Sequence, residues 1–166
     1  MTDYALRPAA PADLPDIVRL VHALATYERE ADAFTANEAD FARLMFCPNP
    51  LAEAILAEVP GREPAGIALF TTTVNTFKGR TGLFLEDLFV EPDLRGAGLG
   101  KALMRRLAEV AAERNCNNIE WRVLNWNEPS IAFYERLGAA KISRWHVRRL
   151  DGPALTALAK GEPWHG

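Results

Sequence analysis

Residues 81–111 constrain the fold of this chain more than any other segment. An apolar strand pattern covers residues 81–90 and ends at Glu91 and Pro92, and a glycine-rich loop follows at 95–100. The next residues have the spacing of an amphipathic helix, whose apolar face is Leu99, Leu103, Leu107, Val110 and Ala111. A strand that passes through a tight loop into a helix is the first half of a β-α-β unit, so we expect an α/β fold.

Strand and helix patterns also occur on both sides of this segment. Strands are predicted at residues 4–7, 51–59, 65–74, 118–124 and 141–150, and helices at 11–25, 37–46 and 128–137. Turn residues at 61–64 join two of these strands as a hairpin, and Gly138 suits the end of the last helix. The order predicts a mixed sheet, in which a run of antiparallel strands precedes the β-α-β unit.

Size and charge set the broad class. The 166 residues suit a single domain, residues 1–166, with one core. A formal net charge of −3 offers no broad basic surface, so we expect no nucleic-acid partner. The first residues lack the order of a signal peptide, and no apolar run approaches membrane-spanning length. We therefore expect a cytoplasmic protein with no membrane partner.

Cysteine and histidine residues show no metal-ligand spacing. Cys47 and Cys116 lie far apart, and His22, His146 and His165 are isolated. We expect two reduced interior thiols and no metal; a disulfide or a catalytic thiol is the minor alternative.

The glycine loop carries the clearest chemical signal. A helix N-terminus presents unpaired N–H groups, and glycines let a phosphate approach them closely. Positive charge nearby comes from Arg95, Lys101, Arg105 and Arg106. The loop does not match a Walker A motif, because Arg95 and Ala102 stand where that motif has a glycine and a serine or threonine. It does not match a dinucleotide-binding fingerprint either, because Lys101 stands where the last glycine is required. The pattern Arg/Gln-x-x-Gly-x-Gly/Ala is met by Arg95, Gly98 and Gly100; the alternative is a plain strand-to-helix turn.

That third pattern is the coenzyme A pyrophosphate loop of the GNAT superfamily of N-acetyltransferases, which this chain resembles. Within it, the chain is similar to the spermidine/spermine and thialysine N-acetyltransferase branch. The matching pieces, in family order, are residues 7–9, 24–28, 57–60, 85–90, 95–100, 126–134 and 136–139. The resemblance implies a mixed, mostly antiparallel central sheet flanked by helices, with splayed parallel strands around the arm of acetyl-CoA, and it implies a homodimer. Trp145 and Trp164 are candidate dimer contacts or ordinary aromatics.

The resemblance also assigns the cosubstrate site. The strand at 83–90 is expected to carry a bulge, and the backbone of Leu88, Phe89 and Val90 to bond the pantetheine arm, with the Leu88 N–H as a donor to the thioester carbonyl. Asn127 is expected to contact the arm, to cap the following helix, or both. The expected pyrophosphate cradle is Arg95, Gly96, Ala97, Gly98, Leu99, Gly100 and Lys101.

Four further residues match the reacting groups. Tyr134 matches the general acid that protonates the leaving thiolate, a workable transfer for a phenol with a pKa of about 10. Glu86 is expected to face the acceptor and help to remove the proton of an ammonium with a pKa of about 10.4, and Asp87 to have a structural partner. Tyr27 and Glu28 match acceptor-side residues, or form an ordinary helix terminus. The mechanism implied is direct attack in a ternary complex.

The chain departs from polyamine acetyltransferases at residues 74–80. The acidic residue and the tryptophan of those enzymes are replaced near Asn75 and Phe77, and Lys78 and Arg80 add positive charge. A polyamine would be repelled there, which favours a smaller amine that also bears a carboxylate, such as a lysine-like amino acid, with Asn75 on the acceptor side. The alternatives are a protein or peptide N-acetyltransferase and a non-catalytic acyl-CoA sensor.

Overall fold

The computed structural model describes residues 3–144 and 146–161. The chain divides into two compact units, Met1–Leu124 and Asn125–Gly166, each with its own elements. In the described part of the chain, no helix combines the length and the apolar character needed to cross a membrane. Trp145 and Trp164, the candidate dimer contacts, lie outside the described residues.

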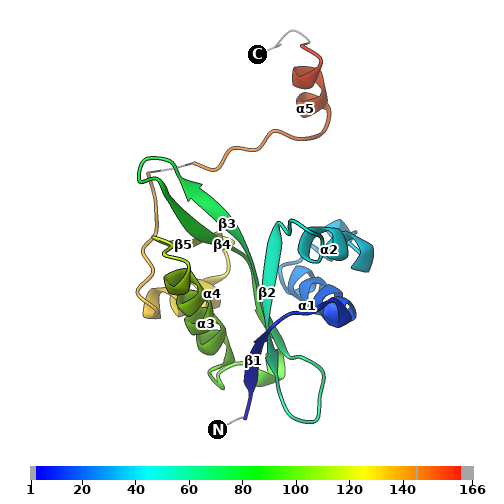
Figure 1. The fold of residues 1–166 in the computed structure, drawn as a ribbon, viewed down its shortest axis with the longest axis vertical. Helices are drawn as coiled ribbons and strands as arrows, with labels where there is room; N and C mark the ends of the chain where they lie inside the picture. Colours follow the sequence, from blue (N-terminus) through cyan, green and yellow to red (C-terminus); the bar gives the residue numbers. More distant parts are fainter. Residues whose placement is uncertain (1–2, 145, 162–166) are drawn as a thin grey trace. The chain divides into compact units, whose positions relative to one another are not determined.

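The first unit is built on a five-stranded sheet in which the strands follow their order in the sequence (Figure 1). The strands are β1 (Ala5–Pro8), β2 (Ala52–Glu58), β3 (Gly66–Asn75), β4 (Arg80–Val90) and β5 (Ile119–Trp121). All neighbouring pairs are antiparallel except β4 and β5, which are parallel. This arrangement confirms the mixed, mostly antiparallel sheet, the hairpin of β2 and β3, and the β-α-β unit. Strand β5 is shorter than the predicted 118–124.

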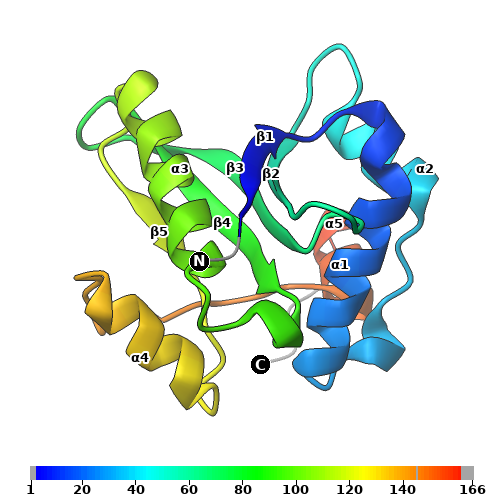
Figure 2. The same ribbon diagram turned by 90° about the horizontal axis from the view of Figure 1, so that it is seen from below.

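Helices cover both faces of this sheet (Figures 1 and 2). On one face lie α1 (Leu14–Tyr27) and α2 (Glu38–Met45), whose residues Ile17, Leu20, Leu24, Phe41 and Met45 form a core cluster with Ile67, Leu69 and Phe89 of the sheet. On the other face lies α3 (Leu99–Glu113), whose buried side chains include Leu99, Leu103, Leu107, Val110 and Ala111, as predicted. Short 3-10 turns occur at Pro11–Asp13, Ala31–Ala33 and Pro92–Leu94.

A β-bulge in β4 changes which face its residues occupy. Phe70 pairs with Leu85 and Leu69 pairs with Asp87, so Glu86 is the extra residue. Without the bulge, Leu85 and Asp87 would share a face, because side chains alternate along a strand. With it, Leu85 lies on the α3 face together with Phe70, whereas Asp87 lies on the α1 face together with Leu69. The bulge expected from the family resemblance is therefore present.

The second unit contains α4 (Glu128–Arg136) and α5 (Gly152–Ala159). The predicted helix at 128–137 is confirmed, Asn127 caps it by accepting a hydrogen bond from the Ser130 N–H at 3.3 Å, and Gly138 follows it with a φ of 86°. The strand predicted at 141–150 is wrong, because residues 141–144 and 146–150 have no regular structure. The physical reason is the need for a partner: the described elements of this unit are helices, which offer no edge to pair with.

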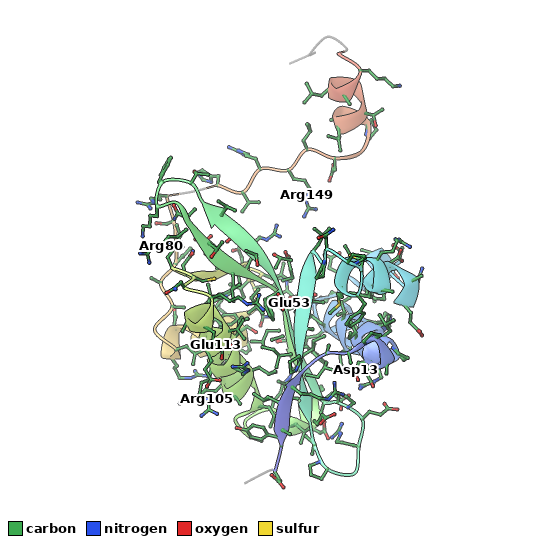
Figure 3. The ribbon with its side chains drawn as sticks, viewed as in Figure 1. Asp13, Glu53, Arg80, Arg105, Glu113 and Arg149 are labelled. Carbon is green, nitrogen blue, oxygen red and sulfur yellow. The ribbon has the colours of Figure 1, made fainter. Side chains whose placement is uncertain are left out.

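Leu103 tests the packing of α3 against the sheet. Its side chain is fully buried, so Leu103→Ala leaves a cavity that the rigid sheet cannot close. We expect the free energy of unfolding to fall by about 2–5 kcal/mol, as measured by urea denaturation. Arg105→Ala, two residues along the same helix with its side chain 73% exposed (Figure 3), is the control and should change it by less than about 0.5 kcal/mol. Equal losses in both variants would contradict this packing.

Candidate active site

The loop between β4 and α3 forms an open cradle of backbone N–H groups. Gly96 and Gly98 have φ values of 80° and 94°, a region that side chains rarely adopt, and a methyl group on either would meet no described atom within 4 Å. The first hydrogen bond of the helix joins the Ala102 N–H to the Gly98 carbonyl at 2.9 Å. The N–H groups just before Ala102 therefore remain open to an anion, so the loop fits the pyrophosphate of coenzyme A.

The positive side chains around this cradle differ in whether they are exposed or already paired with a carboxylate. Lys101 is exposed on the first turn of α3. Arg105 is also largely exposed, with Glu109 at 3.6 Å. Arg106 pairs with Glu109 at 3.2 Å and with Glu113 at 2.8 Å, and these hydrogen bonds raise its pKa above the ordinary value. Lys101 is therefore the better placed of these cations for the pyrophosphate.

Arg95 begins the loop, but its side chain turns toward α1. Its Nε–H donates a hydrogen bond to the Val90 carbonyl at 3.1 Å. Its guanidinium carbon lies 4.5 Å from the centre of the Tyr27 ring and 5.6 Å from that of Phe89, within the range of cation–π contact. Figure 2 shows the segment after β4 beside the C-terminal end of α1. Arg95 thus joins the cradle to the acceptor-side residue Tyr27.

Beyond the bulge, β4 extends past its parallel neighbour. In the first unit, β5 pairs only with Leu83–Leu85. The Glu91 N–H bonds the Ala65 carbonyl on the β3 side, so by alternation the backbone of Phe89 points to β3 and that of Leu88 and Val90 points to the opposite edge. Leu88 and Val90 therefore present backbone groups where the family resemblance expects the pantetheine arm. Phe89 contributes to the site through its side chain, whose ring contacts the guanidinium of Arg95.

The two carboxylates at the bulge have different surroundings. Glu86 is exposed, accepts a hydrogen bond from Thr71 Oγ1 at 3.3 Å, and lies 3.8 Å from Arg122. Asp87 is mostly buried, and its pKa is raised to about 6, first by burial and then by the charges of Glu86 and Glu28. In the described part of the chain, the groups that shift this pKa are all acidic. Among the described residues, no cation lowers the pKa of Asp87, and its side chain lies on the α1 face.

Of the other residues predicted to lie on the acceptor side, Glu28 is close enough to Asp87 to raise its pKa, whereas Asn75 is distant from it. Burial, followed by the charge of Glu30, raises the pKa of Glu28. Asn75 lies at the tip of the β3–β4 hairpin beside Arg80 (Figure 3), where its Oδ1 accepts a hydrogen bond from the Lys78 N–H at 3.1 Å. It is roughly 20 Å along the sheet from Asp87 at the rise of an antiparallel strand.

Tyr134 and Asn127 belong to the second unit. Tyr134 lies on α4, where its ring contacts that of Phe133 with centroids 5.2 Å apart and planes inclined by 59°. The Asn127 side chain is buried and caps α4. The capping alternative for Asn127 is therefore confirmed, and its predicted contact with the cosubstrate stays a prediction.

Two features of this site were missed by the sequence interpretation. Asp87 was expected to have a structural partner, yet the groups in the described chain that shift its pKa are Glu86 and Glu28, which are both acidic. The stacking of Arg95 on Tyr27 was not expected at all. A run of two carboxylates in an apolar strand is a signal for the first of these, because burying both is costly unless one is used. No local pattern signals the second.

Comparison with known proteins agrees with this geometry. Residues 19–139 match the model of the acetyltransferase (GNAT) family. Thialysine N-epsilon-acetyltransferase of Bos taurus is 33% identical over 96% of this chain and 99% of its own length. A spermidine/spermine N(1)-acetyltransferase-like protein of Homo sapiens is also 33% identical, over 96% of this chain and 24% of its own length. An integron cassette protein from V. cholerae superposes with a TM-score of 0.79 at 26% identity, covering 96% of this chain and 99% of that protein.

The chain therefore belongs to the GNAT acetyltransferase family, and it is an enzyme of the N-acetyltransferase class. The family uses acetyl-CoA, whose phosphates and arm fit the glycine cradle and the open edge of β4 described above.

Proposed function

We propose that this enzyme transfers the acetyl group of acetyl-CoA to the primary amine of a small molecule, with a lysine-like or thialysine-like amino acid as the acceptor. The bulge of β4 carries this proposal. It places the open edge at Leu88 and Val90 beside Asp87, a carboxylate with acidic neighbours. An alkyl ammonium supplies the missing positive charge, because an opposite charge nearby stabilises an ionised carboxylate.

The charges at the hairpin tip disfavour a polyamine. Phe77 at this tip is 97% exposed, and Lys78 and Arg80 follow it with two positive charges. A polyamine, which carries several ammonium groups, would be repelled as it approaches this part of the sheet. A shorter amino acid held at Asp87, roughly 20 Å away along the strands, would not reach the tip. The names of the relatives support both acceptor classes, thialysine in one case and spermidine or spermine in the other.

The proposed roles of the residues follow from the direct attack of an amine. Acetyl-CoA supplies the activated acyl group. Asp87 and Glu28 hold the acceptor's ammonium, and Glu86 helps its proton to leave through water. The Leu88 N–H donates a hydrogen bond to the carbonyl oxygen as charge develops there. Tyr134 gives its proton to the thiolate when the carbon–nitrogen bond has formed and the carbon–sulfur bond breaks. The newly bonded nitrogen loses its second proton, and that proton returns through water to the Tyr134 oxygen.

The oligomeric state, the cellular location and the domain organisation are also part of this proposal. A homodimer, a cytoplasmic location and a single domain over residues 1–166 stay predictions. The alternative activities are acetylation of a protein or peptide N-terminus and acyl-CoA sensing without turnover. A sensor has no need for an acid and a base, so Tyr134 and Glu86 in their proposed roles favour catalysis.

A thiol-release assay tests the proposed function. Acetyl-CoA is incubated with lysine, thialysine, spermidine, spermine, simple diamines and a peptide N-terminus, and CoA formation is followed. We expect thialysine or lysine to give the highest kcat/KM. A panel in which spermidine exceeds thialysine would contradict the acceptor class, and binding of CoA without turnover of any amine would favour a sensor.

A further inference from the structure

The guanidinium of Arg95 has no evident task at the pyrophosphate cradle that it precedes. Its Nε–H is used by the Val90 carbonyl, and its charge lies over the Tyr27 ring at 4.5 Å. Other arginines of the first unit pair with a carboxylate, as Arg62 does with Asp93 at 2.7 Å. Neither Asp87 nor Glu28 has a pKa that responds to Arg95, so its charge does not serve those carboxylates.

The contacts of Arg95 join three parts of the proposed site. Its backbone lies at the start of the cradle, next to Gly96 with its positive φ. Its Nε–H reaches Val90, at the open edge of β4. Its guanidinium covers Tyr27, the last residue of α1 and the neighbour of Glu28. A movement of the cradle therefore moves the group that holds the Tyr27 ring.

We propose that Arg95 is a positioning residue that couples the cosubstrate loop to the acceptor side of the site through the Tyr27 ring. The kinetic test of this inference rests on the proposed function, because it needs an amine acceptor. The coupling itself can be measured with the protein and CoA alone. A pyrophosphate in the cradle fixes the backbone at Arg95 and Gly96. The guanidinium is then held over Tyr27, and the acceptor meets an ordered ring.

Kinetics of Arg95→Met and Tyr27→Leu test this coupling. Arg95→Met keeps the length of the side chain and removes both the charge and the N–H donor. We expect it to raise the KM of the amine roughly threefold to tenfold, in the range of a partly exposed cation–π contact. Tyr27→Leu should have a similar effect, and the double variant should be no worse than the worse single variant. Arg95→Lys, which keeps the charge without the Nε–H bond, should lie between wild type and Arg95→Met.

Arg105→Met is the matched control, because it removes one positive charge from a largely exposed side chain further along the chain, in the middle of α3. It should leave the KM of the amine unchanged. An Arg95→Met variant that raises the KM of acetyl-CoA alone, or effects that multiply in the double variant, would overturn the proposal. If Arg95→Met does not fold, as judged by thermal melting, the same comparison is made with Arg95→Lys.

A spectroscopic measurement separates this inference from the proposed function. The chain has three tyrosines, so protein labelled with ¹³C-tyrosine gives few ring signals, and that of Tyr27 is assigned with Tyr27→Phe. We expect CoA to shift the Tyr27 signal in the wild type, and this shift to be lost in Arg95→Met. A Tyr27 signal that CoA leaves in place in the wild type would overturn the coupling. Failure of every amine in the assay would reject the proposed function and leave this result standing.

Discussion

Replacing Tyr134 with phenylalanine is expected to lower kcat by roughly a hundredfold or more, the range for the loss of a positioned acid. The phenylalanine ring keeps the shape of the side chain on α4 and its contact with Phe133, and only the hydroxyl group is removed. Without it, the thiolate leaves unprotonated or takes its proton from water. Steady-state rates of thiol release at saturating acetyl-CoA and amine measure the effect, and the affinity for CoA should change little.

Tyr4→Phe is the matched control, since it removes a phenol close to β1 that has no role in the proposed chemistry. It should keep the wild-type kcat. If Tyr134→Phe kept the wild-type kcat, Tyr134 would not be the acid, and the thiolate would take its proton from the solvent.

The segment from β4 to α3 could be predicted from the sequence because its signals are local. Leu99, Leu103 and Leu107 repeat at helical spacing, and Gly96 and Gly98 lie where φ is positive. The hairpin of β2 and β3 is equally local, since its turn and its alternation are adjacent in the chain. The signals for the helix and the loop depend on residues fewer than about ten positions apart.

The features that escaped prediction depend on partners distant in the sequence. The segment 141–150 has strand-forming residues, but a strand needs an edge to pair with, and the helices described in its unit give none. The bulge in β4 was predicted, but only through the family resemblance, because strict alternation alone would have put Asp87 on the face of Leu85. The direction of Arg95 depends on Tyr27, which lies far earlier in the chain.

Asp87→Asn is expected to make the protein more stable and less active. The folded carboxyl has a pKa of about 6 against an ordinary value of 3.8, so between these values the folded protein binds the extra proton. Stability therefore falls as pH rises through this window, and the full penalty is present above pH 6. Asparagine cannot ionise. Urea denaturation should show a gain of about 1–3 kcal/mol at pH 7 and little difference below pH 4.

The same substitution should lower kcat/KM by roughly a hundredfold, because it removes the buried charge that pairs with the ammonium. The acid limb of the wild-type profile, near pH 6, should disappear with it. Glu86→Gln is the matched comparison: Glu86 is exposed, so its stability should change by less than about 0.5 kcal/mol. If Glu86→Gln lost more activity than Asp87→Asn, the exposed carboxylate at the bulge would be the main acceptor group. The opposite order would mean that the bulge keeps a destabilising charge beneath α1 because catalysis needs it there.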